Sequence, residues 1–298
     1  MGRILRWVLP LLAFPAWAGD LPDFDTPRAW EHLIAQCRFG PRVPGSEGHR
    51  RCAAYLEETL RATGGDVVLQ PFRTRPEGFP EEVEMTNVLA RFGPSGPPIL
   101  LGAHWDTRRW ADEDPDSTRR DEPILGANDG ASGVAVLLAL AERFATAPPP
   151  VAVEIALFDG EDQGSHGSPE SWCLGSREHV RRRVGTAPRI AIIVDIVGGE
   201  DLRICREEYS ETYAPWLNDL IFARAQALGL QAFEDRVCYS VYDDHVPFLE
   251  RGVPAVDLVD MHFPQWHTHE DVPGSCSPES LGQIGTLLVD LVYGGALD

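Results

Sequence analysis

The stretch Phe158-Asp159-Gly160-Glu161-Asp162 decides the fold, because it places two adjacent carboxylates directly after an apolar run at residues 151–158. A short apolar run of this kind indicates a buried strand, and the glycine after it indicates a turn. In open α/β sheets the active site lies outside the carboxyl ends of the strands. An isolated acidic pair is more often a solvated turn, so the rest of the chain must decide whether Glu161 and Asp162 form a site.

Strand and helix patterns alternate on both sides of this stretch. Apolar runs predict further strands at residues 67–72, 85–92, 99–103, 189–197, 236–240 and 254–259. Helical spacing predicts helices at residues 26–37, 47–63, 134–144, 177–183, 212–228, 244–251 and 278–293, with Asp25 and Ser46 as caps of the first two. Residues 107–123 are charged and nearly free of aliphatic side chains, so we expect an exposed loop there. This alternation predicts a single α/β domain with a mixed, mostly parallel central sheet flanked by helices.

The length, charge and first residues limit the class of protein. The chain has 298 residues and a formal net charge of −20, and such a field repels nucleic acid and anionic membrane surfaces. Residues 1–18 resemble a signal peptide, since two arginines precede an apolar run and Ala16-Trp17-Ala18 offers a cleavage site. We therefore expect an exported periplasmic or extracellular protein, with residues 19–298 as one catalytic domain and no stable membrane association.

The six cysteines are compatible with disulfides in an exported protein. They form no Cys-x-x-Cys pair, and their scatter does not indicate a zinc knuckle or a redox motif. Cys37 and Cys52 lie on consecutive predicted helices, and we expect this pairing if any.

Polar residues that suit metal chemistry fall at the predicted strand ends or at the starts of the following elements. Each residue alone has an ordinary explanation as a surface group or a helix cap. Together they supply carboxylate and imidazole ligands without thiolate, the set that suits a catalytic Zn²⁺ with an open position. The set consists of His104, Asp106, Asp129, Glu161, Asp162, Asp195 and His267.

The order and setting of these residues resemble the zinc aminopeptidase family that also contains the animal-type glutaminyl-peptide cyclotransferases. The motifs are Gly-Ala-His-Trp-Asp at residues 102–106, Gly-Ala-Asn-Asp-Gly-Ala-Ser-Gly at residues 126–133 and Phe-Asp-Gly-Glu-Asp at residues 158–162. Residues 39–46 and 243–254 resemble the cyclotransferases more closely than the peptidases. Asp243 stands where the peptidases commonly carry serine, and Trp266 precedes His267 as in the cyclotransferases.

The resemblance implies a role for each matched residue. Asp129, Asp162 and His267 would bind one Zn²⁺, Glu161 would shuttle protons, Asp195 and Asp243 would form an acid network beside it, and Trp266 would line the substrate pocket. The implied reaction converts the N-terminal glutamine of peptides or proteins to pyroglutamate with release of ammonia.

Three features depart from the family pattern. Asp162 replaces the usual glutamate, Gly167 stands where the cyclotransferases place an aromatic residue, and their cysteine pair beside the site is missing.

Two other interpretations use the same residues. In a secreted aminopeptidase with two Zn²⁺ ions, Asp129 would bridge the metals, His104 and Asp195 would hold the second ion, and Glu161 would activate water. Asp106 would then support the second metal or the acid network. A metal-free binding protein on this fold would be expected to have lost ligands, and only the exchange at Asp162 suggests any loss.

Overall fold

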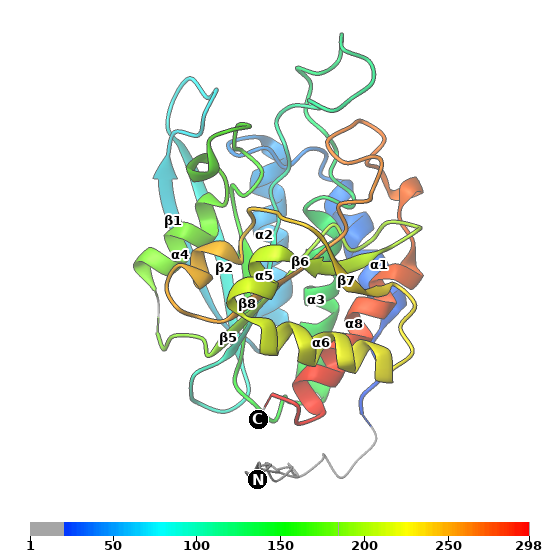
Figure 1. Cartoon of the computed structure of the whole chain (residues 1–298). Helices are drawn as coiled ribbons and strands as arrows, with labels where there is room; N and C mark the ends of the chain where they lie inside the picture. The colour runs from blue at the N-terminus through cyan, green and yellow to red at the C-terminus, as the bar shows by residue number, and fades with distance from the viewer. Residues whose placement is uncertain (1–20, 184, 298) are drawn as a thin grey trace, which may run out of the picture.

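The computed structural model describes residues 21–183 and 185–297 (Figure 1). A six-stranded sheet with the order β1-β2-β4-β3-β5-β8 forms its centre. The strands are β1 (Asp66–Thr74), β2 (Val83–Phe92), β3 (Ile99–His104), β4 (Val153–Phe158), β5 (Ile190–Asp195) and β8 (Ala255–Val259). Strands β4, β3, β5 and β8 are mutually parallel, whereas β1 and β2 join in antiparallel fashion. The predicted mixed, mostly parallel sheet is confirmed.

Helices cover both faces of this sheet (Figure 1). One face carries α1 (Thr26–Cys37), α2 (Glu47–Ala62), α3 (Ala131–Thr146) and α8 (Pro278–Tyr293). The other face carries α4 (Leu174–Arg182) and α7 (Val246–Leu249). Helices α5 (Glu208–Tyr213) and α6 (Pro215–Ala227) pack beside β8, and α6 also contacts α8.

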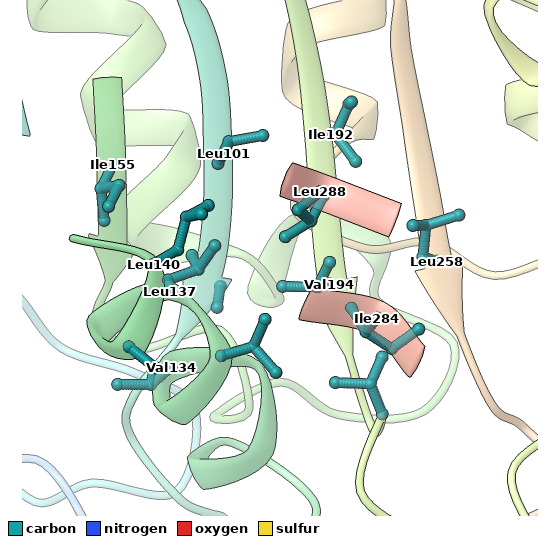
Figure 2. Packing of buried hydrophobic residues seen from close by; sticks show 14 of the residues in the cluster. Leu101, Val134, Leu137, Leu140, Ile155, Ile192, Val194, Leu258, Ile284 and Leu288 are labelled. Atoms are coloured by element: carbon teal, nitrogen blue, oxygen red, sulfur yellow. The ribbon is translucent and has the colours of Figure 1, made fainter. Parts of the chain in front are cut away.

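The alternation of side chains along the strands creates two cores. Leu101, Ile155 and Ile192 point to the larger core, where α3 and α8 contribute leucines and isoleucines (Figure 2). Their neighbours Leu100 and Ile193 point to the smaller core under α4 and α7. Because both faces of the sheet are buried, its parallel strands are apolar throughout, as the apolar runs in the sequence indicate.

The predicted helix starts are confirmed by their caps. The Asp25 carboxylate accepts a hydrogen bond from the Arg28 backbone N–H at 3.0 Å, and the Ser46 hydroxyl accepts one from the His49 N–H at 3.1 Å. The helix predicted at residues 212–228 is confirmed as α6 (Pro215–Ala227), but it starts three residues later than predicted. The backbone breaks at Ala214 between α5 and α6, because Pro215 has no N–H to continue the first helix and starts the second instead.

A small parallel sheet of β6 (Ile204–Glu207) and β7 (Phe233–Tyr239) lies outside the main sheet, and β6 was not predicted. The expected Cys37–Cys52 disulfide is wrong, since both thiols are free. Cys205 and Cys238 form the disulfide instead and join the two short strands, with 5.7 Å between their Cα atoms. Helices that are consecutive in the sequence need not bring their cysteines within bonding distance.

The predicted signal peptide lies outside the described residues. Within the described part of the chain, no helix is both long and apolar enough to cross a membrane.

Candidate active site

The parallel strands deliver the predicted residues to one edge of the sheet. His104 ends β3, Glu161 and Asp162 follow the end of β4, and Asp195 ends β5. Asp129 lies just before α3, and a loop after β8 brings His267 to the same edge. All of these side chains are buried. The site therefore lies at the carboxyl ends of the strands, as predicted.

Asp129, Asp162 and His267 converge in one group. The His267 Nε2 atom lies 3.2 Å from Asp162 Oδ1 and 3.6 Å from Asp129 Oδ2. Ligand atoms at zinc bond lengths in a tetrahedral site are about 3.3 Å apart. The spacing therefore fits the three predicted ligands around one Zn²⁺.

The chemistry of Asp162 also fits a cation. Its two carboxylate oxygens are buried and accept no hydrogen bond from the described residues. Burial and the charge of Asp129 raise the pKa of Asp162 to about 6. The Arg108 guanidinium, 3.6 Å away, compensates this buried carboxylate only in part because it donates no hydrogen bond to it, and a metal would supply the missing contact despite the shorter side chain.

His104, Asp129 and Asp195 form a second group that shares Asp129 with the first. The His104 Nε2 atom lies 3.0 Å from Asp195 Oδ1, with which it is hydrogen-bonded, and 3.1 Å from Asp129 Oδ1. Burial alone would lower the pKa of His104, but Asp195 and the other nearby carboxylates raise it well above its usual value. The group therefore offers one imidazole and two carboxylates at the spacing of a second candidate metal site.

Asp106 shapes the turn that carries the acidic pair. Its carboxylate accepts hydrogen bonds from the backbone N–H of Glu161 at 3.0 Å, the N–H of Asp162 at 3.3 Å and the Gln163 side-chain amide at 2.8 Å. Its Oδ1 atom also lies 3.5 Å from His104 Nδ1. These contacts engage both Asp106 oxygens in holding the turn that carries Glu161 and Asp162.

Glu161 faces a second acid. Oxygen atoms of Glu161 and Asp243 and the Cys173 sulfur lie within 4.8 Å of one another. Burial, followed by the charges of Asp243 and Asp244, raises the pKa of Glu161 well above its usual value. The Cys173 thiol donates a hydrogen bond to Glu161 Oε1 at 3.3 Å. This environment suits a carboxyl group that takes up and returns a proton near neutral pH.

A cavity of about 270 Å³ opens over these acids. Trp266 lines this cavity, and its ring stacks on His267 with 3.8 Å between ring centroids. Trp172 forms another wall and lies parallel to His267 at 6.3 Å. Trp172 was not predicted, because the family pattern places the aromatic residue at Gly167. That glycine lines the same cavity, and the aromatic ring comes from five residues further along the sequence.

Three backbone positions at the site are strained. Cys173 has a φ of 57°, Ile196 a φ of 51° and His267 a φ of 56°, a region that non-glycine residues rarely adopt. Ile196 follows Asp195 and lines the cavity, and its N–H donates to Asp195 Oδ1 at 2.8 Å. Strain of this kind persists where the surrounding contacts fix the conformation, as they do at functional sites.

The loop predicted to be exposed at residues 107–123 is only partly so. Residues 115–123 are exposed, whereas Arg108, Ala111 and Asp114 are buried. Asp112 Oδ1 lies 3.1 Å from His267 Nδ1. The prediction fails for the first half of the loop because its charges are paired inside the protein instead of solvated.

Comparisons with known proteins agree with this geometry. The chain is 27% identical over 330 residues to a glutaminyl-peptide cyclotransferase-like protein of Bos taurus, with 97% of this chain and 81% of that protein covered. The crystal structure of Bacteroides thetaiotaomicron glutaminyl cyclase bound to N-acetylhistamine superposes with a TM-score of 0.87 and 34% identity, with 92% of this chain and 99% of that one covered.

A leucine aminopeptidase precursor from Bacteroides thetaiotaomicron is equally similar, with a TM-score of 0.87 and 34% identity over 92% of this chain and 98% of that chain. Residues 87–292 match the model of peptidase family M28. This match spans most of the protein and includes every predicted metal ligand. It also covers the strands that carry the candidate site. The chain belongs to peptidase family M28.

Proposed function

We propose that this protein is a zinc-dependent glutaminyl-peptide cyclotransferase that converts the N-terminal glutamine of peptides or proteins to pyroglutamate and releases ammonia. The observation that carries this proposal is the buried pairing of Glu161 with Asp243 beneath a cavity walled by two tryptophans. The similarity to glutaminyl cyclases supports it.

One metal ion is proposed, held by Asp129, Asp162 and His267. No described residue donates a hydrogen bond to the carboxylate of Asp162, whereas His104 already hydrogen-bonds Asp195, and this difference favours the first group over the second. A bound Zn²⁺ ion supplies Lewis-acid polarisation of a carbonyl group.

In the proposed reaction, the α-amine nitrogen attacks the δ-carbon of the same glutamine. A new bond between these two atoms closes the ring, and the bond between the δ-carbon and the amide nitrogen of the glutamine breaks. Glu161 accepts a proton from the attacking amine and returns it to the departing nitrogen, which leaves as ammonia. Burial, followed by the charges of Asp243 and Asp244, keeps the pKa of the Glu161 carboxyl group high, so that it can carry the proton. No water molecule is consumed.

Asp195 belongs to the same acid network in this proposal. Its carboxylate is hydrogen-bonded to His104, and burial raises its pKa to about 7. Asp243 lies directly beside Glu161, and its charge strengthens the hold of the Glu161 carboxylate on the proton that it takes from the amine.

The cavity suits one terminal residue. Its volume of about 270 Å³ lies below the usual range for small-molecule sites, which begins at about 300 Å³. Trp266 and Trp172 present flat apolar walls that would fold the glutamine side chain back toward its own amine and exclude bulk water.

The second candidate is a two-zinc aminopeptidase. The convergence of His104, Asp129 and Asp195 favours it, as does the similarity to a leucine aminopeptidase precursor. In that case Glu161 would activate water for hydrolysis of the first peptide bond.

A paired substrate assay separates the two functions. Zinc-loaded protein is incubated with a Gln-initiated peptide and with a Leu-initiated peptide of otherwise identical sequence, and the products are followed by mass spectrometry. The proposal predicts a Gln-peptide product lighter by one ammonia with its first peptide bond intact, and an unchanged Leu-peptide. Release of free leucine or glutamine at a rate comparable to cyclisation would assign the protein to the aminopeptidases.

We also propose that the mature protein is exported and comprises residues 19–298 as one catalytic domain. The disulfide between Cys205 and Cys238 supports export, because such bonds persist in oxidising compartments. Cell fractionation followed by N-terminal sequencing should give a mature protein that begins near Gly19. An intact N-terminus on the active protein would contradict this proposal.

A further inference from the structure

Arg108 is a buried guanidinium next to the proposed zinc site, with 2% of its side chain exposed. It makes four hydrogen bonds to three partners. Its Nε and Nη2 atoms donate to the two Asp112 oxygens at 2.9 and 2.6 Å. Its Nη1 atom donates to the backbone carbonyls of Asp162 and Gly164 at 2.9 and 3.0 Å. Such a planar fork is specific to arginine, because lysine has a single charged nitrogen.

Asp112 connects this guanidinium to one proposed ligand. Its Oδ1 atom lies 3.1 Å from His267 Nδ1, while His267 Nε2 faces Asp129 and Asp162. A carboxylate beside Nδ1 favours the tautomer that carries its proton on Nδ1. Nε2 then keeps its lone pair for a metal.

The other half of the fork fixes a second proposed ligand. Arg108 Nη1 holds the carbonyl of Asp162, and it lies 3.6 Å from the Asp162 carboxylate. The N–H of Asp162 is held on the opposite side by Asp106. Both backbone polar groups of Asp162 are therefore hydrogen-bonded. Its carboxylate can change position only by rotation about the side-chain torsions.

Arg108 also supports the pocket wall. Its guanidinium carbon lies 4.7 Å from the centre of the Trp172 ring, within the range of a cation–π contact. Trp172 is parallel to His267 at an interplanar angle of 9°. Arg108 thus contacts the backbone of one ligand, the carboxylate that orients another, and the ring that shapes the substrate cavity.

We propose that Arg108 and Asp112 are positioning residues that set the zinc affinity of the site and, through Trp172, its affinity for substrate. The substrate part of this inference, the effect on substrate affinity, rests on the proposed function. The metal part, the effect on zinc affinity, depends only on the group formed by Asp129, Asp162 and His267. Neither residue contacts the reacting atoms, so both act through His267, Asp162 and Trp172.

Zinc affinity tests the metal part without any activity assay. The dissociation constant is measured by competition with a chelator of known affinity for wild type, Asp112→Asn and Arg108→Lys. We expect both variants to bind zinc about 10- to 100-fold more weakly, the usual effect of mutating residues that orient metal ligands. Arg119→Lys is the matched control, because Arg119 lies in the same loop but is 47% exposed and pairs with Glu122.

Steady-state kinetics at saturating zinc test the substrate part. Arg108→Lys and Trp172→Leu should raise KM about tenfold or more, and any fall in kcat should be smaller than the rise in KM, since the stacked ring holds the substrate without transferring protons. Trp172→Leu should leave the zinc affinity unchanged, whereas Asp112→Asn should change zinc affinity far more than KM.

The outcomes are distinguishable. Zinc dissociation constants within about threefold of wild type in both Asp112→Asn and Arg108→Lys would overturn the metal part. A loss of kcat with unchanged KM in Arg108→Lys and Trp172→Leu would overturn the substrate part. Protein that binds zinc with the expected pattern but does not cyclise glutamine would refute the proposed function and leave the positioning of the ligands standing. If Arg108→Lys does not fold, Asp112→Asn decides the metal part and Trp172→Leu the substrate part.

Discussion

Removal of the Cys205–Cys238 disulfide should destabilise the protein and disturb the pocket. The bond closes a loop of 33 residues. In the chain-entropy model, a crosslink across that separation removes about 12.5 cal/mol/K from the unfolded ensemble, or about 3.7 kcal/mol at 25 °C. We expect Cys205→Ala/Cys238→Ala to lose about 2–4 kcal/mol of unfolding free energy, since measured effects are often smaller than the model value.

Urea unfolding at saturating zinc measures this difference, because the contribution of metal binding is then common to both proteins. The midpoint should fall in the double variant, and its m-value should rise slightly as the unfolded protein, no longer crosslinked, exposes more surface. Cys37→Ala is the control, because Cys37 is a free and only partly buried thiol. A thiol count on the denatured wild type should give four free groups, one for each of the unpaired cysteines.

The effect should extend to function through β7. This strand ends at Tyr239, and the next residues, 240–243, line the cavity and carry Asp243. The Glu207 carboxylate on β6 accepts the Val241 N–H at 3.1 Å and couples the two segments. Six free thiols in the wild type, or an unfolding midpoint that does not move when the disulfide is removed, would refute the reasoning.

Three further predictions concern single residues. Glu161→Gln should keep zinc and fold but lose at least about 100-fold in turnover, and normal activity in the zinc-loaded variant would remove Glu161 from the mechanism. His104→Ala should leave zinc stoichiometry near one by elemental analysis, whereas a drop from two would support the aminopeptidase. Burial of the His32 imidazole lowers its pKa to about 4 in the folded protein, against about 6.5 in the unfolded chain. The free energy of unfolding is therefore unaffected by His32 above pH 6.5 and falls by up to about 3 kcal/mol as the pH is lowered toward 4. His32→Gln should flatten that part of the stability–pH curve in urea titrations, and an unchanged slope would contradict the assignment.

The features that could be predicted well from the sequence depend on local physics. A cap such as Ser46 bonds an N–H three residues away, and an apolar run becomes a strand wherever both of its faces are covered. The edge of the sheet at which the candidate metal-binding residues meet was predictable for a related reason. Parallel strands place their carboxyl ends together, so His104 and Asp195 had to meet once β3 and β5 were adjacent.

The features that could not be predicted depend on contacts between distant segments. Cys238 lies 33 residues after its partner, and nothing near either cysteine indicates that β6 and β7 pair. Trp172 lines the cavity with its ring parallel to that of His267, a contact between segments far apart in the sequence. Arg108 has the sequence pattern of a solvated charge, since its partners are backbone carbonyls and a carboxylate whose positions are fixed only in the folded protein.

The exchange at Asp162 shows why ligand identity and ligand position must be considered together. An aspartate has one methylene fewer than the glutamate usual in the family, and from sequence alone this suggests a displaced metal. In the fold, its N–H is bound by Asp106 and its carbonyl by Arg108, and its Oδ1 still comes within 3.2 Å of His267 Nε2. The backbone that carries Asp162 is therefore held where the shorter side chain reaches the same point as the other ligands. In the proposed metal site, Asp106 and Arg108 would thus position Asp162 as a ligand, and the loop that supplies Arg108 and Asp112 would be part of that site.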